Sequence, residues 1–229
     1  MAQILKDGGT PILMSHLGRP KRNDPEFSLS HIVKYIERVL GVKVKFTNEV
    51  LGEKTTTVVK KSGPGEIVLL ENLRFCPEEK NGDLKFAEEL SKLGDSYVND
   101  AFGTAHRAHA STSIIASFFP KNKFAGELLL KEVESIHKVM NTGKKPVLGI
   151  LGGAKVSSKI TIINNIMDKV DKLIIGGGMA FTFIKAQGGQ IGDSICEDDK
   201  TSLALSILEK AKEKKVEIYL PSDVVCAND

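Results

Sequence analysis

The sequence predicts an α/β fold with mostly parallel sheets, and three observations lead to this class. Short apolar runs alternate along the chain with segments whose apolar residues recur at helical spacing, which is the pattern of parallel strands joined by helices. The 229 residues are 41% hydrophobic and 27% charged, as in folded domains, which excludes disordered, collagen-like and coiled-coil chains. One long helical pattern near the middle ends in a Gly-Lys-Lys-Pro break and separates the strands into two groups.

Strands and helices alternate before the long helix. Residues 10–15 form a short apolar run between turn residues, which is typical of a buried strand. The helical pattern at 28–40 is followed by Gly41, a residue that favours the left-handed turn at a helix end. Alternation at 42–46 indicates a strand with one solvent-facing side. The other predicted elements are a strand at 66–70, a helix at 84–93 and a strand at 96–98.

The long helix is predicted over residues 125–140 and supplies the best domain boundary. Its apolar residues fall on one broad face, and the break that follows stops the helix. The second group of elements has strands at 147–151, 173–175 and 216–220 and helices at 157–170, 180–186 and 202–214.

The charge and the cysteines restrict the function classes. A net charge of +3 over this length indicates neither nucleic acid nor a membrane as a partner, so a positive field must be local to be informative. No run of about 18 apolar residues exists, so no membrane helix is expected. The cysteines Cys76, Cys196 and Cys226 are odd in number, far apart and without a CxxC motif, which is typical of reduced thiols in a cytoplasmic protein.

Basic side chains follow three of the strands predicted in the first half. Ligands of a parallel α/β sheet bind beyond the carboxyl ends of its strands, so we expect these side chains at the same edge of one sheet. Arg and His there would form an anion site for a small, multiply charged substrate. A single Arg or His in a loop is more often a solvated surface residue, and only the agreement of three loops favours a site. The residues are His16, Arg19, Arg74, His106, Arg107 and His109.

A glycine-rich turn follows the first strand of the second half. Gly152 and Gly153 lie between that strand and a helix, where backbone N–H groups approach phosphate closely and a helix N-terminus favours an anion. Lys155 and Lys159 are four residues apart, so we expect both on one face of the first helical turns. The alternative is a plain turn with solvated lysines.

A second glycine-rich turn, residues 176–178, ends the next strand. A flat base and a phosphate chain could lie between the two turns, which makes Gly177 and Gly178 candidates for a nucleotide site. Tight packing of strand and helix is an equally good explanation of these glycines. Neither turn matches the GxxxxGK[ST] or GxGxxG motifs.

Five motifs occur in an order that resembles phosphoglycerate kinase. They are SHLGRP at 15–20, ENLRF at 71–75, NDAFGTAHRAH at 99–109, GGAKV at 152–156 and IGGGM at 175–179. The resemblance implies two Rossmann-like, parallel-sheet, three-layer domains, both incomplete in this chain. It implies an N-terminal phosphoglycerate-binding domain at 1–124 without its first strand, an inter-domain helix and hinge at 125–145, and the first part of a C-terminal nucleotide-binding domain at 146–229.

The same resemblance implies a glycolytic kinase. The family transfers a phosphoryl group between 1,3-bisphosphoglycerate and ADP, giving 3-phosphoglycerate and ATP, with Mg²⁺. Such a transfer depends mainly on positioning and charge stabilisation, and closure of the two domains would align the substrates and exclude water.

The resemblance also implies a role for each candidate residue. His16, Arg19, Arg74 and Arg107 match the residues that hold phosphoglycerate, and His106 and His109 lie beside them. Lys155 matches the lysine that meets the transferring phosphoryl group, and Lys159 matches the lysine of the nucleotide phosphates. Gly152, Gly153, Gly177 and Gly178 would form the backbone wall of the nucleotide pocket. The residues expected to be catalytic are Arg19, Arg107 and Lys155.

The family's chain begins earlier and continues further than these 229 residues. The missing parts would include a substrate-side arginine and the Gly-Gly-Asp loop that serves the metal, so no metal ligand is expected in this chain. We therefore expect negligible turnover from this chain alone, together with open sheet edges or uncovered apolar faces. A full-length member is expected to be a cytoplasmic monomer, whereas this chain would self-associate or need a complementing fragment.

Two other classes compete with an active kinase. A non-catalytic phosphate- or nucleotide-binding module would keep the pockets and show binding without turnover. A nicotinamide oxidoreductase is disfavoured because no GxGxxG motif is followed by an acidic residue about 20 positions on. Nucleic acid is disfavoured as a partner because the basic residues lie in strand-end loops without interleaved aromatic residues.

Overall fold

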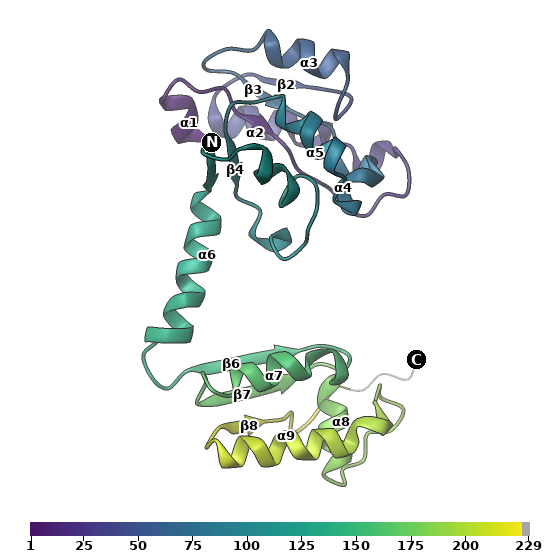
Figure 1. The fold of residues 1–229 in the computed structure, drawn as a ribbon. Helices are drawn as coiled ribbons and strands as arrows, with labels where there is room; N and C mark the ends of the chain where they lie inside the picture. The colour runs from purple at the N-terminus through teal and green to yellow at the C-terminus, as the bar shows by residue number, and fades with distance from the viewer. Residues whose placement is uncertain (226–229) are drawn as a thin grey trace. The chain divides into compact units, whose positions relative to one another are not determined.

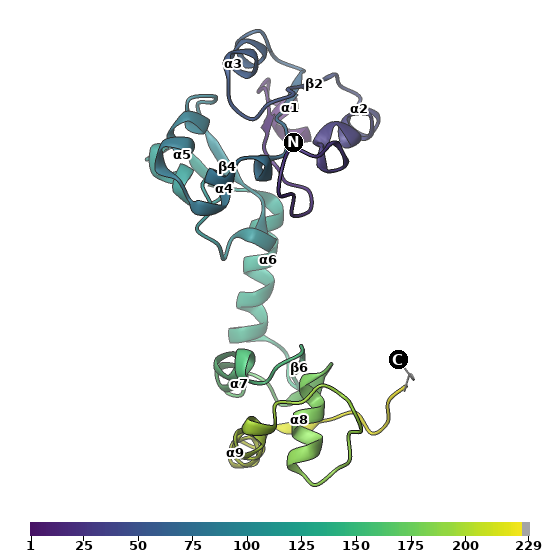
Figure 2. The ribbon, with the colours of Figure 1, turned by 90° about the vertical axis from the view of Figure 1, so that its right-hand side faces the viewer.

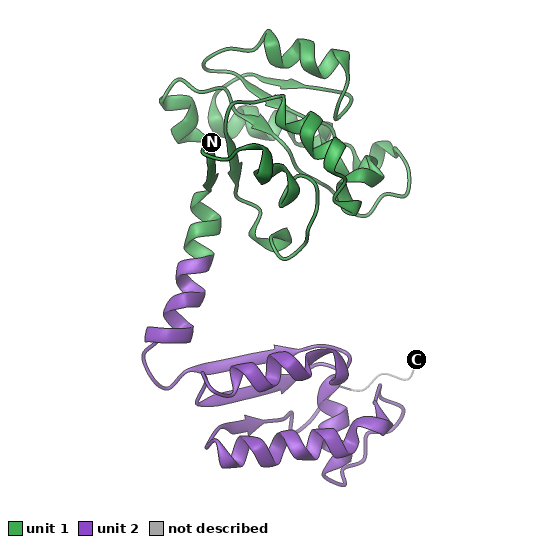
Figure 3. Cartoon of the chain, in the orientation of Figure 1, with its two compact units in different colours: residues 1–132 green, residues 133–229 purple. Residues whose placement is uncertain are grey.

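The structure, a computed structural model, describes residues 1–225, and the chain divides into two compact units (Figures 1 and 3). Unit 1 comprises Met1–Glu132 and unit 2 comprises Val133–Asp229, so the division falls inside the helix α6 (Glu127–His137). All strand pairs in the described part are parallel, which confirms the predicted α/β class. No helix among these residues is long and apolar enough to cross a bilayer.

Unit 1 is built around a three-stranded sheet with the order β1-β3-β2. The central strand β3 (Ile67–Leu69) pairs with β1 (Ile12–Leu13) and with β2 (Val44–Phe46). All of β3 is buried because both faces of the sheet are covered. The helices of this unit are α1 (Ala2–Lys6), α2 (Val33–Leu40), α3 (Glu53–Lys60), α4 (Pro77–Asn81) and α5 (Leu84–Ser91).

The alternation of side chains along β3 separates two cores. Ile67 and Leu69 belong to the core on the α2 side of the sheet. Val68 and Leu70 belong to the opposite core, to which α5 contributes Phe86. Figure 2 shows α2 and α5 on opposite sides of this sheet, so unit 1 has the predicted three layers.

A separate pair of strands carries the third basic loop. β4 (Tyr97–Asn99) pairs with β5 (Lys123–Ala125) and, in the described part, not with the β1-β3-β2 sheet. The prediction that all three loops leave one sheet is therefore wrong for the third loop. β5 also takes the first residue of the predicted long helix. α6 begins only at Glu127, where Asp100 Oδ1 accepts a hydrogen bond from the Leu129 N–H at 3.0 Å.

Other local differences from the predicted elements have simple causes. α3 contains the run TTTVV, whose branched side chains disfavour a helix, but its valines pack against the core. The short helix α4 begins at Pro77, where the missing N–H of proline costs nothing. The helix predicted at 28–40 begins as a 3₁₀ turn, Leu29–Ile32, and continues as α2, which ends at Gly41 with a φ of 66° as predicted.

The strands of unit 2 follow one another across the sheet in the order β6-β7-β8. The elements are β6 (Leu148–Gly152), α7 (Ile160–Ile166), β7 (Lys172–Gly176), α8 (Met179–Ala186), α9 (Thr201–Glu213) and β8 (Glu217–Tyr219). Crossovers between parallel strands are right-handed, so strands that advance in one direction place their helices on one face. The core on that face joins Leu173 and Ile175 of β7 to Ile163, Phe183 and Ile207 of the helices.

The opposite face of the unit 2 sheet is uncovered within the described residues. Leu148 and Ile150 of β6 are 51% and 71% exposed, and Tyr219 of β8 is 43% exposed. The register places Ile150 beside Ile174, and Ile174 beside Tyr219, so these side chains share one face. The described part of unit 2 therefore has two layers, as predicted for a three-layer domain that is incomplete in this chain, and it has the uncovered apolar face that the sequence leads us to expect.

Two of the three cysteines lie in the described part. Cys76 and Cys196 are free thiols, as predicted, and burial raises the pKa of the Cys76 thiol to about 11. Cys226 lies outside the described residues.

Candidate functional site

Basic side chains from three segments of unit 1 come together. His16 and Arg19 follow β1, Arg74 lies in the 3₁₀ turn after β3, and Arg107 and His109 lie in the segment after β4. The charges of Arg19 and Arg107 act on Arg74. The charges of Arg74 and His109 act on His16. We name these five residues the basic cluster.

His106 is the one predicted substrate residue outside the basic cluster. It is exposed, and its charge is not among those of the described residues that act on His16, Arg74 or His109. The other candidates meet even though β4 belongs to a separate sheet. The first two segments thus leave one edge of the β1-β3-β2 sheet, and contacts with buried polar side chains hold the third segment beside them.

A buried polar pair, Glu71 and Asn72, fixes the first segment against the end of β3. The Asn72 side-chain amide donates to the carbonyl oxygens of Leu17 and Phe27 at 2.9 and 2.8 Å. The Glu71 carboxylate accepts from the N–H of Leu29 at 2.8 Å. No role for this pair is predicted from the sequence, although two polar residues directly after a wholly apolar strand are the signal that marks it.

A second buried carboxylate, that of Glu79 in α4, fixes the third segment. Its two oxygens accept hydrogen bonds from the Ser111 N–H at 3.0 Å and from the Ser111 hydroxyl at 2.6 Å. His109 Nδ1 lies 3.9 Å from the same carboxylate. Nothing in the sequence marks Glu79, because a glutamate in the first turn of a helix normally faces solvent.

The basic cluster carries more positive charge than its surroundings neutralise. Desolvation lowers the pKa of His16, and two other cluster residues lower it further. Desolvation also lowers the pKa of Arg74, and the other two arginines add to the effect. Burial is the largest cause of the lowered pKa of His109, which the charge of Glu79 opposes. Within residues 1–225 the arginines of the cluster form no ion pair, so an anion would be stabilised there.

The glycine-rich turns of unit 2 pack against each other. Gly177 has a left-handed φ of 67°, and a Cβ there would lie 3.0 Å from both the nitrogen and the oxygen of Gly153. A Cβ on Gly178 would lie 2.5 Å from Cγ2 of Ile195. The Met179 N–H donates to the Gly153 carbonyl at 2.8 Å. Close approach of the two turns therefore accounts for Gly177, and close approach of Ile195 accounts for Gly178, so packing explains both glycines.

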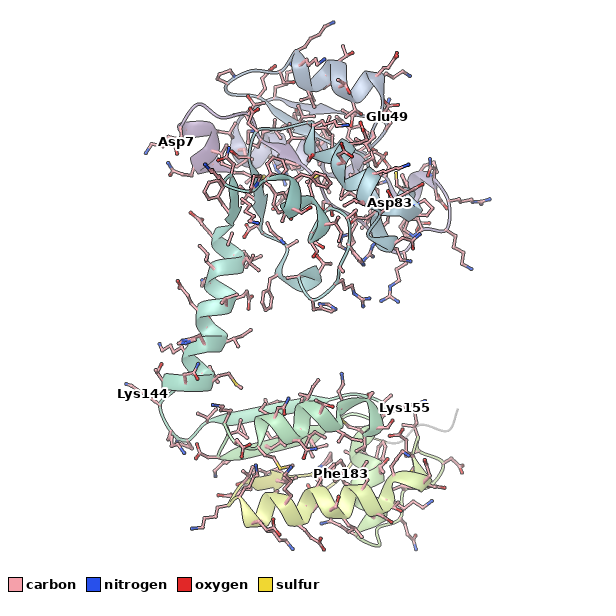
Figure 4. The ribbon with its side chains drawn as sticks, in the orientation of Figure 1. Asp7, Glu49, Asp83, Lys144, Lys155 and Phe183 are labelled. Carbon is pink, nitrogen blue, oxygen red and sulfur yellow. The ribbon has the colours of Figure 1, made fainter. Side chains whose placement is uncertain are left out.

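The predicted phosphate lysines lie differently around the first turn. A Cβ on Gly153 would lie 3.5 Å from Lys159 Cε, so the Lys159 side chain runs along this turn. Lys155 is exposed and precedes the helical segment (Figure 4). Helical structure starts with the 3₁₀ turn Ser157–Lys159, and α7 follows. The expectation that both lysines share the first helical turns is therefore wrong for Lys155. Gly152, at the end of β6, has only the Gly176 carbonyl within 4.0 Å of a Cβ placed there.

An internal carboxylate occupies the start of this helical segment. Glu197 accepts hydrogen bonds from the Ser157 N–H at 3.0 Å and from the Ser157 hydroxyl at 2.5 Å. These bonds lower the pKa of the Glu197 carboxyl, and the charge of Lys155 adds to the effect. The chain itself thus supplies an anion at the position where the glycine–lysine pattern predicts one.

The described residues contain no group of three or more His, Cys, Asp or Glu side chains that could hold a metal ion. They therefore offer no site that would hold Mg²⁺ by protein side chains alone. One cavity of about 510 Å³ in unit 1 is lined by carboxylates and by no basic side chain. The carboxylates are those of Asp24, Glu49, Glu71 and Glu78, and none of the predicted substrate residues lines the cavity.

Comparison with known proteins identifies the family. A family profile described as "Phosphoglycerate kinase" matches residues 1–229. The chain belongs to the phosphoglycerate kinase family. A phosphoglycerate kinase of Chlorobium phaeobacteroides (strain BS1) is 47% identical over 228 residues, which cover 99% of this chain and 57% of that protein. "Phosphoglycerate kinase, cytosolic" of Nicotiana tabacum is 47% identical over 225 residues, which cover 98% of this chain and 56% of that protein.

The fold agrees with that of a solved phosphoglycerate kinase. The structure of phosphoglycerate kinase from Coxiella burnetii matches with a TM-score of 0.77 at 38% identity, over 96% of this chain and 55% of that chain. The resemblance found in the sequence and its Rossmann-like fold are thereby confirmed. This chain spans little more than half the length of the phosphoglycerate kinases that it matches.

Proposed function

We propose that the complete protein is a glycolytic phosphotransferase that moves a phosphoryl group between 1,3-bisphosphoglycerate and ADP, giving 3-phosphoglycerate and ATP. Membership of the phosphoglycerate kinase family supports this reaction. In the proposal the N-terminal part, residues 1–124, binds phosphoglycerate. Residues 125–145 connect it to the nucleotide-binding part, which begins at 146.

The basic cluster is the observation that supports the proposal most directly. 3-Phosphoglycerate carries a phosphate and a carboxylate, and the planar fork of arginine matches both groups. A bound anion also opposes the desolvation, and the repulsion from the other two arginines, that lower the pKa of Arg74. In the proposal His16, Arg19, Arg74 and Arg107 bind the substrate, with His106 and His109 beside them.

The nucleotide is proposed to bind at the glycine-rich turns of unit 2. Lys155 meets the transferring phosphoryl group, and Lys159 binds the nucleotide phosphates. The exposure of Lys155 and the course of Lys159 along the turn at Gly153 support these roles. The backbone of Gly152, Gly153, Gly177 and Gly178 lies against the nucleotide.

The proposed transfer needs little covalent chemistry from the protein. The bond between the acyl oxygen and phosphorus breaks while an oxygen of ADP takes the phosphoryl group, and negative charge spreads over the oxygens of that group. Arg19, Arg107 and Lys155 stabilise this charge. The family uses Mg²⁺ with ATP and ADP, and the described residues contain no group of side chains that would hold the ion alone.

The 229-residue polypeptide and the complete protein are proposed to behave differently. For the polypeptide alone we propose negligible turnover, because it spans little more than half the length of the phosphoglycerate kinases that it matches. We also propose self-association, because its unit 2 sheet exposes an apolar face. For the complete protein we propose a cytoplasmic monomer. The free thiols and the cytosolic relative from Nicotiana tabacum support that location.

Calorimetric titration of the polypeptide with 3-phosphoglycerate and with ADP tests the two sites separately. We expect Arg74→Ala to weaken the binding of 3-phosphoglycerate by about tenfold or more, because a charge-assisted hydrogen-bonding group is lost. Arg38→Ala is the matched control, since Arg38 lies over the Tyr35 ring in α2 and outside the basic cluster. Equal affinities of the two variants would contradict the proposed substrate site.

A coupled assay of phosphoryl transfer tests the reaction. Turnover is expected from the complete protein and not from the 229-residue polypeptide. A complete protein that binds both substrates without transferring the group would instead be the non-catalytic binding module.

A further inference from the structure

Glu79 is a buried carboxylate directly behind the basic cluster. The residue is only 4% exposed, and it lies in α4, the helix that follows the Arg74 turn. Both carboxylate oxygens are used, because the Ser111 N–H and the Ser111 hydroxyl donate to them at 3.0 and 2.6 Å. The main-chain carbonyl of the same residue accepts from the Ala110 N–H at 2.9 Å. Glu79 therefore binds two consecutive residues of the segment that carries Arg107 and His109.

That segment has other supports besides Glu79. It joins no strand ladder after β4, but Ala110 is buried in the core that α5 shares, and the Asn99 side-chain amide donates to the Thr112 carbonyl at 3.0 Å. The Tyr97 hydroxyl donates to the Ser111 carbonyl at 2.7 Å, which fixes the same residue from the other side. The main chain of Gly82, at the end of α4, lies so close that a Cβ there would be 2.4 Å from the Ala108 oxygen. Among these supports, the Glu79 carboxylate is the side chain of α4 that binds the segment through both of its oxygens.

Glu79 does not suit a direct role with an anion. Its carboxylate carries the same sign of charge as phosphate, and its oxygens already have donors. Its negative charge acts on Arg74 and on His109, which belong to two different segments of the basic cluster. An acidic group in this place influences ligand binding only through the residues that it holds.

We propose that Glu79 is a positioning residue of the anion site, which keeps Arg107 and His109 beside Arg74 by its two hydrogen bonds to Ser111. The inference rests on the proposed function only for the identity of the anion. It extends that function by assigning a role to a residue that makes no contact with the substrate.

Three variants separate hydrogen bonding from charge. Glu79→Ala removes both bonds. Glu79→Gln is the conservative variant, because its amide oxygen accepts from the Ser111 N–H and its amide nitrogen donates to the Ser111 hydroxyl oxygen. Ser111→Ala removes one bond and keeps the carboxylate. Glu78→Gln is the matched control, since Glu78 is an exposed neighbour in the same helix.

The measurement is a titration of the 229-residue chain with inorganic phosphate and, separately, with 3-phosphoglycerate, followed by the ring signals of His16 and His109 in NMR spectra. In Glu79→Ala we expect the affinity for phosphate to fall about tenfold, and in Ser111→Ala about threefold, as hydrogen bonds to a charged group are lost. The Glu79→Gln and Glu78→Gln variants should remain within about twofold of the unchanged chain.

The two histidines distinguish positioning from a general loss of structure. His16 belongs to a different segment, so its response to phosphate should persist in Glu79→Ala while the His109 response disappears. A parallel loss of both responses would overturn the inference, as would an unchanged affinity of Glu79→Ala or a Glu79→Gln variant as weak as Glu79→Ala. If Glu79→Ala does not fold, an unchanged affinity of Ser111→Ala would overturn it.

The two probes also separate this inference from the proposed function. Binding of phosphate without binding of 3-phosphoglycerate would contradict the proposed substrate. The phosphate affinities of the Glu79 variants would then still test the positioning role of Glu79. A chain that binds neither anion would overturn the inference itself.

Discussion

At the scale of single residues, the basic cluster is held by side chains that bind the main chain. The side-chain amide of Asn72 donates to two carbonyl groups, and its Oδ1 accepts from the Arg74 N–H at 3.0 Å. One fully buried side chain thus satisfies three main-chain groups from two segments. Its removal would leave those groups without partners in a place that water reaches poorly, which is costly.

Asn72→Ala should therefore lower the free energy of unfolding by about 2–3 kcal/mol. Urea denaturation measures this value for the variant and for the unchanged chain. Asn48→Ala is the control, because Asn48 is exposed, and it should change the stability by less than about 0.5 kcal/mol. A loss in Asn72→Ala no larger than in the control would show that the hydrogen bonds contribute nothing.

The histidines of the basic cluster should respond to an anion. Both have a pKa below the ordinary 6.5, chiefly because of desolvation, so in NMR titrations their midpoints should lie below this pH. Added 3-phosphoglycerate favours the protonated rings and should raise both pKa values. Glycerol, which is uncharged, is the control ligand. Midpoints that do not move with 3-phosphoglycerate would show that it binds elsewhere.

The same shifts make the stability of unit 1 depend on pH. The folded-state pKa of each histidine lies below the unfolded value of 6.5, so the unfolded chain binds more protons between these two values. The free energy of unfolding should therefore be highest above about pH 6.5, where the histidines are neutral in both states. It should decrease as the pH falls from there towards the folded-state pKa values.

At the scale of secondary structure elements, local sequence patterns predict the strands whose residues are buried. β3 and β7 are predicted because their apolar runs lie inside cores. β5 is not, because its three residues are exposed and form no buried apolar run.

The site divides in the same way. The loops with His16, Arg74 and Arg107 are predicted because each follows a strand. Glu79 and Glu197 are not, since their partners lie 32 and 40 residues away in the sequence. A local pattern carries no information on such contacts.

The contact between the two glycine-rich turns leads to a prediction about the stability of unit 2. In Gly177→Ala, the new Cβ would lie 3.0 Å from main-chain atoms of Gly153 in addition to the left-handed strain, so we expect a loss of about 2–4 kcal/mol. Gly192→Ala is the control, because Gly192 has a φ of 56° but nothing within 4 Å of a Cβ, and it should lose only about 1 kcal/mol. Equal losses in thermal or urea unfolding would refute the packing explanation.

At the scale of the whole chain, the uncovered face of the unit 2 sheet leads to a prediction about behaviour in solution. Leu148, Ile150 and Tyr219 present apolar surface on one side, while the helices cover the other side. Exposed apolar surface of this kind favours association between molecules.

The 229-residue polypeptide should therefore self-associate, and Ile150→Lys should weaken this association. Sedimentation velocity over a range of concentrations measures the effect. Ile162→Lys is the control, because Ile162 of α7 is 46% exposed but lies in the helical layer. A polypeptide that remains monomeric at every concentration, or an Ile150→Lys variant that associates as before, would contradict the proposal.

The contacts of Asn72 have a practical consequence for spectroscopy. Asn72 recognises the carbonyl oxygen of Leu17 and not its side chain, which is 40% exposed. The substitution Leu17→Cys would keep the hydrogen bond from Asn72 to the carbonyl oxygen of residue 17. It would also place a thiol-reactive fluorophore one residue from His16. The loop therefore offers an attachment point at which a dye reports on the occupancy of the basic cluster while its main-chain anchor stays intact.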